Sequence, residues 1–174
     1  MLPLDEIDFE NKKVEIGFSS CGLREGVDVD DSGFIYRSIK FICGDRGSPF
    51  RIKKVSDGRY TIWTEHVRPT DKKLMECPLF WTTMGAAMRP EIEFRYCDQP
   101  VDLMDARFWI RRTSKGMFNI GIDDDHESGS DGYALSWMRE FKGSYEWAFF
   151  RPIDAKKGER GIDAFWITDY DTDY

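Results

Sequence analysis

The chain has 174 residues, of which 41% are hydrophobic and 33% charged, as is usual for one globular domain that buries its own core. Its 32 acidic and 25 basic side chains give a net charge of −7, which argues against nucleic-acid binding through phosphates. The apolar runs are too short to span a bilayer, and the polar start is unlike a signal peptide. We therefore expect a single cytoplasmic domain, residues 1–174, with neither a nucleic acid nor a membrane as partner.

The aromatic content of 15%, with 6 Trp and 13 Phe, favours β-strands, because aromatic side chains suit a half-buried pleated surface. Apolar and polar residues alternate first at 14–16 and again at 39–41. This alternation predicts strands with one buried face.

Further along the chain, alternating segments recur as part of a longer repeat. Phe50–Lys54 is followed by a Ser-Asp-Gly corner and by a second alternating segment, 60–62. The same order recurs 58 residues later, where Phe108–Arg112 is followed by a Ser-Lys-Gly corner and by 118–120. Each copy predicts a strand, a tight turn and a second strand, in which the turn glycine supplies a positive φ.

A third copy is divided between the two ends of the chain. Phe165-Trp166-Ile167 lies 57 residues after Phe108, and its missing second strand matches 14–16. Three repeats closed in this way predict an all-β fold, a β-trefoil of three pseudo-repeats of about 58 residues in which Phe50, Phe108 and Phe165 are equivalent. A lipocalin-like barrel and a β-sandwich are the alternatives, although neither predicts the period.

The strands at 14–16, 50–62, 108–110 and 165–167 together resemble the framework of the mycocypins, fungal β-trefoil inhibitors of clitocypin and macrocypin type. The resemblance implies a cytosolic protein that reversibly inhibits papain-like cysteine proteases through surface loops. Framework residues support a fold more than a function, because function lies in the loops.

Two Gly-rich segments are expected as loops: Ser19–Gly26 between the first two strands and Cys43–Pro49 between the third and fourth. In the mycocypins, loops at these places enter the protease cleft. The resemblance thus implies these protease-binding residues: Ser20, Cys21, Gly22, Leu23, Arg24, Gly44, Asp45, Arg46 and Gly47. The alternative is that Gly and Ser here only mark turns.

Residues 64–73 are expected to form the loop between the fifth and sixth strands, where the family carries a second specificity. The resemblance implies a second specificity loop with His66, Arg68 and Lys72. The segment has no Asn, which argues against legumain as target, whereas a cation could enter an acidic specificity pocket. The alternative is a solvated charged loop.

Two further patterns bear on metals and redox state. Asp123, Asp125, Glu127 and Asp131 have calcium-binding chemistry, but the spacing is not that of an EF-hand, and a solvated acidic turn is the preferred interpretation. The four cysteines, at 21, 43, 77 and 97, contain no CxxC pair, so we expect no zinc and no cofactor. Because no leader and no Asn-x-Ser/Thr sequon is found, we expect four free thiols, and the alternative is one or two bridges in a secreted form.

Catalysis is not expected. His66 and His126 are the only imidazoles, and no nucleophile or phosphate-binding motif accompanies them. The predicted function is therefore binding by a monomer, either to a papain-like cysteine protease or another protein, or, as the alternative, to a glycan as a lectin-type trefoil. The only glutamine, Gln99, precedes Pro100, so the Gln-x-Trp signature of ricin-type lectins is missing.

Overall fold

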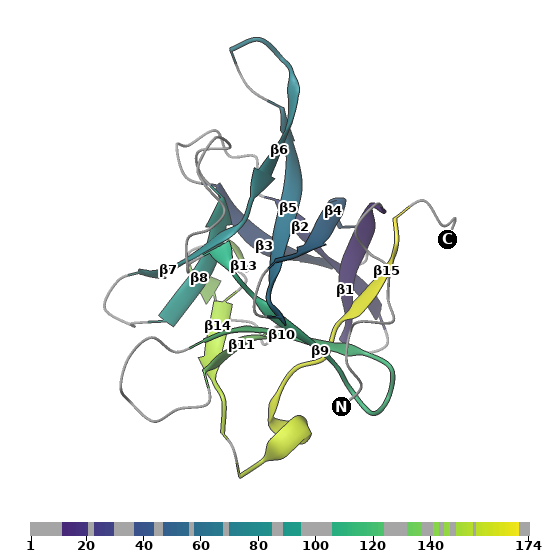
Figure 1. Ribbon diagram of the computed structural model, residues 1–174, viewed down its shortest axis with the longest axis vertical. Helices are drawn as coiled ribbons and strands as arrows, with labels where there is room; N and C mark the ends of the chain where they lie inside the picture. The colour runs from purple at the N-terminus through teal and green to yellow at the C-terminus, as the bar shows by residue number, and fades with distance from the viewer. Residues whose placement is uncertain are drawn as a thin grey trace.

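The computed structural model describes most of the chain, in segments. The described residues are 12–20, 23–29, 37–43, 47–55, 58–67, 70–84, 89–94, 106–123, 132–136, 141–142, 145–146, 149–154 and 156–170. Across these segments the fold is all-β, with antiparallel pairing, no α-helix and a short 3-10 turn, η4 (Gly158–Gly161) (Figure 1). The expectation of an all-β fold is confirmed.

Thirteen strands form one extended sheet, and two short strands pair apart from it. The strands are β1 (Val14–Ser20), β2 (Leu23–Val29), β3 (Arg37–Cys43), β4 (Phe50–Lys54), β5 (Tyr60–Val67), β6 (Leu74–Pro78), β7 (Phe80–Met84), β8 (Arg89–Phe94), β9 (Trp109–Arg112), β10 (Phe118–Ile122), β11 (Tyr133–Ser136), β12 (Phe141–Lys142), β13 (Tyr145–Glu146), β14 (Phe149–Pro152) and β15 (Trp166–Asp169). The β5–β6 hairpin projects from the rest of the molecule at the top of Figure 1.

Three two-stranded units carry the sequence repeat. In the β4–β5 hairpin, Ile52 lies opposite Ile62, and in the β9–β10 hairpin Ile110 lies opposite Ile120. The third unit pairs β1 with β15, which lie side by side in Figure 1, although they come from opposite ends of the chain. The prediction that 14–16 completes the hairpin of 165–167 is confirmed.

The three units are joined to one another at equivalent places. Phe50 pairs with Val14 of β1, and isolated bridges pair Phe108 with Tyr60 and Phe165 with Phe118. In the order β1, β4, β5, β9, β10, β15, neighbouring strands are joined either by direct pairing or by an isolated bridge at the residue just before β9 or β15, and β15 pairs with β1. The three phenylalanines of the sequence repeat therefore occupy equivalent pairing positions.

The turn glycines behave as the sequence predicts. Gly58 has a φ of 68° and Gly116 a φ of 79°, both in the left-handed region. A side chain with a Cβ is strained there, so glycine is favoured at this point of each hairpin.

Apart from β6, which pairs with β5, the remaining strands of the large sheet form a second set of antiparallel pairs: β2 with β3, β7 with β8, and β11 with β14. Each pair lies within one of the three repeats of the chain. The pairs meet through β8, which also pairs with β3 and with β14.

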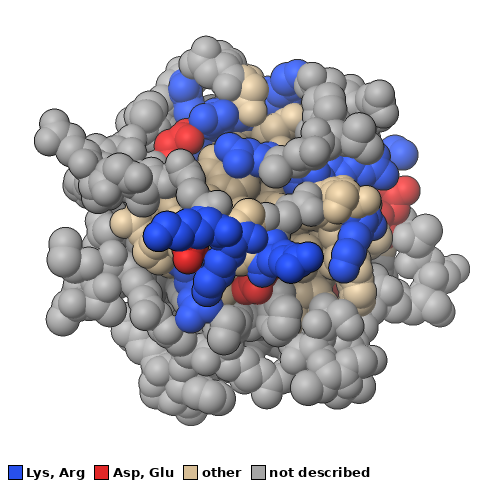
Figure 2. Space-filling view, turned by 90° about the horizontal axis from the view of Figure 1, so that it is seen from below, with Lys and Arg blue, Asp and Glu red and all other residues tan. Residues whose placement is uncertain are grey.

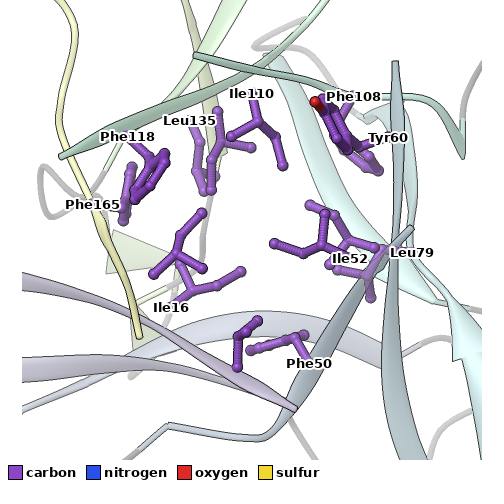
Figure 3. Close-up of a cluster of buried hydrophobic side chains, with 14 of the residues drawn as sticks. Ile16, Phe50, Ile52, Tyr60, Leu79, Phe108, Ile110, Phe118, Leu135 and Phe165 are labelled. Carbon is purple, nitrogen blue, oxygen red and sulfur yellow. The ribbon is translucent and has the colours of Figure 1, made fainter. Parts of the chain in front are cut away.

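One hydrophobic core draws on all three repeats (Figure 3). Phe50, Phe108 and Phe165 are almost fully buried in it, and the paired isoleucines lie beside them. Burying one such side chain contributes about 1.5–3 kcal/mol, so the repeated aromatic and aliphatic positions dominate the stability of the fold.

Three buried polar residues occupy the same position in the three units. Glu15, Thr61 and Asn119 are each only 1% exposed. The amide of Gly47 donates to Oε1 of Glu15 at 3.4 Å, and Nδ2 of Asn119 donates to the carbonyl of Asp163 at 3.0 Å. Glu15 therefore holds the segment that leads to Phe50, and Asn119 holds the segment that leads to Phe165. The shorter Thr61 instead accepts a hydrogen bond from the Trp63 indole at 2.9 Å.

Tryptophans lie on the same face of these units as Glu15, Thr61 and Asn119, away from the paired isoleucines. Trp109 lies across from Gly121, and Trp166 lies across from Gly17. A Cβ on Gly121 would overlap the Trp109 indole, so the ring occupies the space that a side chain would need. In the first unit, Trp63 faces Arg51 instead, and Nζ of Lys53 lies 4.3 Å from the Trp63 ring centroid.

Candidate functional site

The first predicted loop is largely strand. β1 continues to Ser20 and β2 begins at Leu23, with Ser20 opposite Leu23 and Ser19 opposite Arg24. The expectation that all of Ser19–Gly26 forms a loop is therefore wrong. Ser and Gly favour turns, but their backbone groups can pair with a neighbouring strand as those of other residues do. Only Cys21 and Gly22 lie between the two strands, and both are outside the described residues.

The second predicted loop is described at its end. β3 ends at Cys43, and Gly44, Asp45 and Arg46 lie outside the described residues. Gly47 is buried, and its amide faces Glu15. Gly47 is therefore held against β1, three residues before β4 begins.

Strand pairing relates these two segments to each other. Glu25, near the start of β2, lies opposite Cys43, the last residue of β3. The start of β2 and the end of β3, the strand ends that flank residues 21–22 and 44–46, thus lie at the same end of the sheet.

The predicted second specificity loop is also partly strand. β5 extends to Val67 and pairs it with Leu74 of β6, so the expectation of a loop beginning at Thr64 is wrong. His66 lies in β5, although its side chain is not described, and Arg68 is outside the described residues. Lys72 is exposed in the turn and has a φ of 59°, a strained value for a residue with a Cβ.

The end of this hairpin exposes apolar side chains next to basic ones. Val67 is 50% exposed and Leu74 is 61% exposed, and they face each other across the ladder. Lys72 and Lys73 follow in the turn and are exposed as well. The end of this hairpin therefore combines exposed apolar and cationic side chains.

The acidic segment is described only at its beginning. The Arg59 guanidinium binds Asp123 through two hydrogen bonds, of 2.8 and 2.9 Å. Asp125, Glu127 and Asp131 lie outside the described residues, so calcium binding there stays a prediction. Among the side chains that the structure describes, no group of His, Cys, Asp or Glu is arranged to hold a metal ion.

The cysteines differ from expectation. Cys77 is fully buried and disulfide-bonded, so the expectation of four free thiols is wrong. Its partner is one of Cys21, Cys43 and Cys97, whose side chains lie outside the described part of the chain. Wide spacing without a CxxC pair gives no information about which cysteines meet in space. Disulfides persist in oxidising compartments, which weighs against the cytoplasmic location expected from the sequence.

A cationic surface is the feature that the sequence analysis missed. Lys and Arg side chains gather on the face shown in Figure 2. The net charge of −7 gives no sign of this surface, and the basic residues that form it are distant from one another in the sequence. The doublet Arg111-Arg112 and the cluster Lys156-Lys157 were the available sequence signals.

Comparison with known proteins finds a likeness of fold but no likeness of sequence. No protein-family model matches the sequence, and no curated protein matches it. The chain is similar in structure to a salivary protein from Culex quiquefasciatus of the cysteine and tryptophan-rich (CWRC) family, with a TM-score of 0.59 over 93% of this chain and 96% of that one. At 13% identity this likeness concerns the fold alone. Within the described residues, no helix has the length and apolarity to cross a membrane.

Proposed function

We propose that the chain is a β-trefoil that acts by binding rather than by catalysis. The strand order β1, β4, β5, β9, β10, β15, which returns to β1, supports a six-stranded barrel. The pairs β2–β3, β7–β8 and β11–β14, one in each repeat, support the three hairpins that cap such a barrel. A scaffold of this kind holds its loops on rigid strands, which suits recognition of a partner.

The proposed activity is reversible inhibition of papain-like cysteine proteases. The observation that supports it is the pairing of Glu25 with Cys43, because the start of β2 and the end of β3, which flank residues 21–22 and 44–46, lie at one end of the sheet. Two short loops at one end can enter a narrow cleft together. The mycocypin-like framework of the chain supplies the expectation that the cleft belongs to such a protease.

The local structure favours tight binding from a small contact area. A connection of two residues between paired strands has little conformational freedom to lose on binding. The buried Gly47–Glu15 hydrogen bond anchors the second segment just before β4. The β5–β6 hairpin, with Val67 and Leu74 exposed, would make a separate contact outside the cleft.

The test is a titration of papain with the full chain, followed through hydrolysis of a small peptide substrate. Inhibition should be competitive, and the chain should still bind papain whose catalytic cysteine has been alkylated, because no covalent step is involved. Gly22→Trp should weaken binding at least about tenfold, or about 1.4 kcal/mol.

Lys115→Glu is the control, because it alters an exposed residue on a different hairpin, in the turn between β9 and β10. It should leave inhibition unchanged. If micromolar chain fails to inhibit papain and a cathepsin, or if Gly22→Trp and Lys115→Glu weaken inhibition equally, the proposed activity is wrong.

Glycan binding of the lectin type is the alternative. It needs an aromatic ring on which a sugar can stack. The cation of Lys53 lies over Trp63, and the guanidinium of Arg111 lies 4.4 Å from the ring of the buried Trp109. These two rings therefore give the stacking form of glycan binding little support.

A further inference from the structure

The strongest additional feature is the cationic surface, which we name the basic face. It is defined by six described residues: Arg111, Arg112, Lys115, Lys156, Lys157 and Arg160. We propose that the basic face binds a sulfated polysaccharide. This proposal is independent of protease inhibition.

The six residues come from two elements on the same side of the molecule. The β9–β10 hairpin and η4 both lie in the lower part of Figure 1, and Figure 2 views the molecule from that side. Phe118, at the start of β10, exchanges two backbone hydrogen bonds with Phe165, a few residues after η4. Asn119 also donates to the carbonyl of Asp163. These bonds fix the two elements against each other, so the cations form one surface.

Three described carboxylates on or near these elements accept hydrogen bonds. Asp123 binds Arg59, and Asp163 accepts a hydrogen bond of 2.6 Å from the Ser136 hydroxyl. Asp154 accepts from the main-chain amide of Lys156 at 3.0 Å. Among the described residues, no ion pair joins a carboxylate to any of the six cations. In the part of the chain that the structure describes, these cations are therefore available to an external anion.

The chemistry of the face favours a flexible polyanion over a nucleic acid. Single-stranded nucleic acids gain affinity from bases stacked on exposed aromatic rings, but Trp109 beneath this face is buried, with Arg111 over its ring. A long duplex is negatively charged along its whole length. Its phosphates beyond the basic face would be repelled by the acidic residues that give the chain a net charge of −7. Sulfate groups on a flexible chain can be placed on the face alone.

Two further observations favour a sulfated polysaccharide over a membrane. The exposed large apolar residues of the described chain, Val67 and Leu74, lie on the β5–β6 hairpin, so the basic face offers no such side chain for insertion between lipids. The disulfide at Cys77 is typical of an oxidising, extracellular setting. In that setting sulfated polysaccharides are abundant polyanions.

The test measures binding of the full chain to immobilised heparin, a sulfated polysaccharide, by surface plasmon resonance over a salt series. Affinity should fall steeply between about 50 and 200 mM salt, as expected when several cations release counterions. Lys115→Gln combined with Lys156→Gln should weaken binding about tenfold and lower the salt slope by about 1–2. Chemically desulfated heparin should not compete.

The matched control is Lys12→Gln combined with Lys73→Gln, which removes the same charge from exposed positions outside the basic face. It should change affinity less than about twofold if the face is the binding site. Circular dichroism should show that all variants are folded. No binding to heparin at about 150 mM salt, equal losses in the two double variants, or tighter binding to duplex DNA or to anionic vesicles would overturn the proposal.

Discussion

The indole of Trp109 packs directly on the α-carbon of Gly121, the residue opposite it on β10. The two residues come from adjacent strands of one hairpin, and the ring covers the place where a Cβ would stand. The absence of a side chain at Gly121 is therefore a packing requirement.

Gly121→Ala should destabilise the protein by about 1–3 kcal/mol, because the added methyl group displaces the indole from a packed position. Urea unfolding followed by tryptophan fluorescence measures the change. Trp109→Leu in the same background should recover part of the loss, since it removes the overlapping ring. An alanine variant as stable as the parent would show that the indole moves freely.

Thr64→Val should raise the free energy of unfolding by about 1 kcal/mol. The Thr64 hydroxyl is buried, and no hydrogen-bond partner for it is found in the structure. Valine has the same shape without the polar atom that the fold leaves unsatisfied.

Thr113→Val is the matched control for Thr64→Val. The Thr113 hydroxyl accepts a hydrogen bond from the Met117 amide at 3.1 Å, so this change should destabilise by about 1 kcal/mol. Both values come from denaturant unfolding. If both variants shift stability in the same direction, the difference in hydrogen bonding is not the cause.

Phe50→Leu, Phe108→Leu and Phe165→Leu should each cost a similar amount, about 1–3 kcal/mol, because the three rings occupy equivalent pairing positions in one core. Val67→Ala, on an exposed side chain, should change stability by less than about 0.5 kcal/mol. Thermal and urea unfolding give the comparison. A loss confined to one of the three phenylalanines would argue against their equivalence.

The disulfide of Cys77 predicts the thiol count. The protein unfolded without reductant should show no more than two free thiols, because one bridge consumes two of the four cysteines. Reduction should lower the free energy of unfolding by about 2–4 kcal/mol. Four titratable thiols in the purified protein would restore the original expectation of a reduced chain.

The sequence predicted the repeated hairpins because their information is local. Alternating residues with a glycine corner define β4–β5 and β9–β10 within about a dozen residues, and the turn values at Gly58 and Gly116 follow from the same corner. The match between 14–16 and 165–167 could be found because the third copy preserves the pattern of the other two.

Strand ends and long-range contacts could not be predicted in the same way. Ser19 and Ser20 lie in a paired strand although their residue type favours turns, because the neighbouring strand fixes their backbone. The bridge at Cys77 and the surface that joins Lys115 to Lys156 both depend on residues that only the folded chain brings together. Sequence spacing carries no such information.

The pairing of β1 with β15 has a consequence for folding kinetics. Ile16 and Ile167 lie opposite each other, although nearly the whole described chain separates them. The β4–β5 and β9–β10 hairpins can form on the microsecond timescale, whereas this third unit must close a very large loop before its contacts contribute. A high contact order of this kind gives folding times of milliseconds to seconds. We expect the third unit to form last, with the buried faces of the first two exposed to other chains until it does.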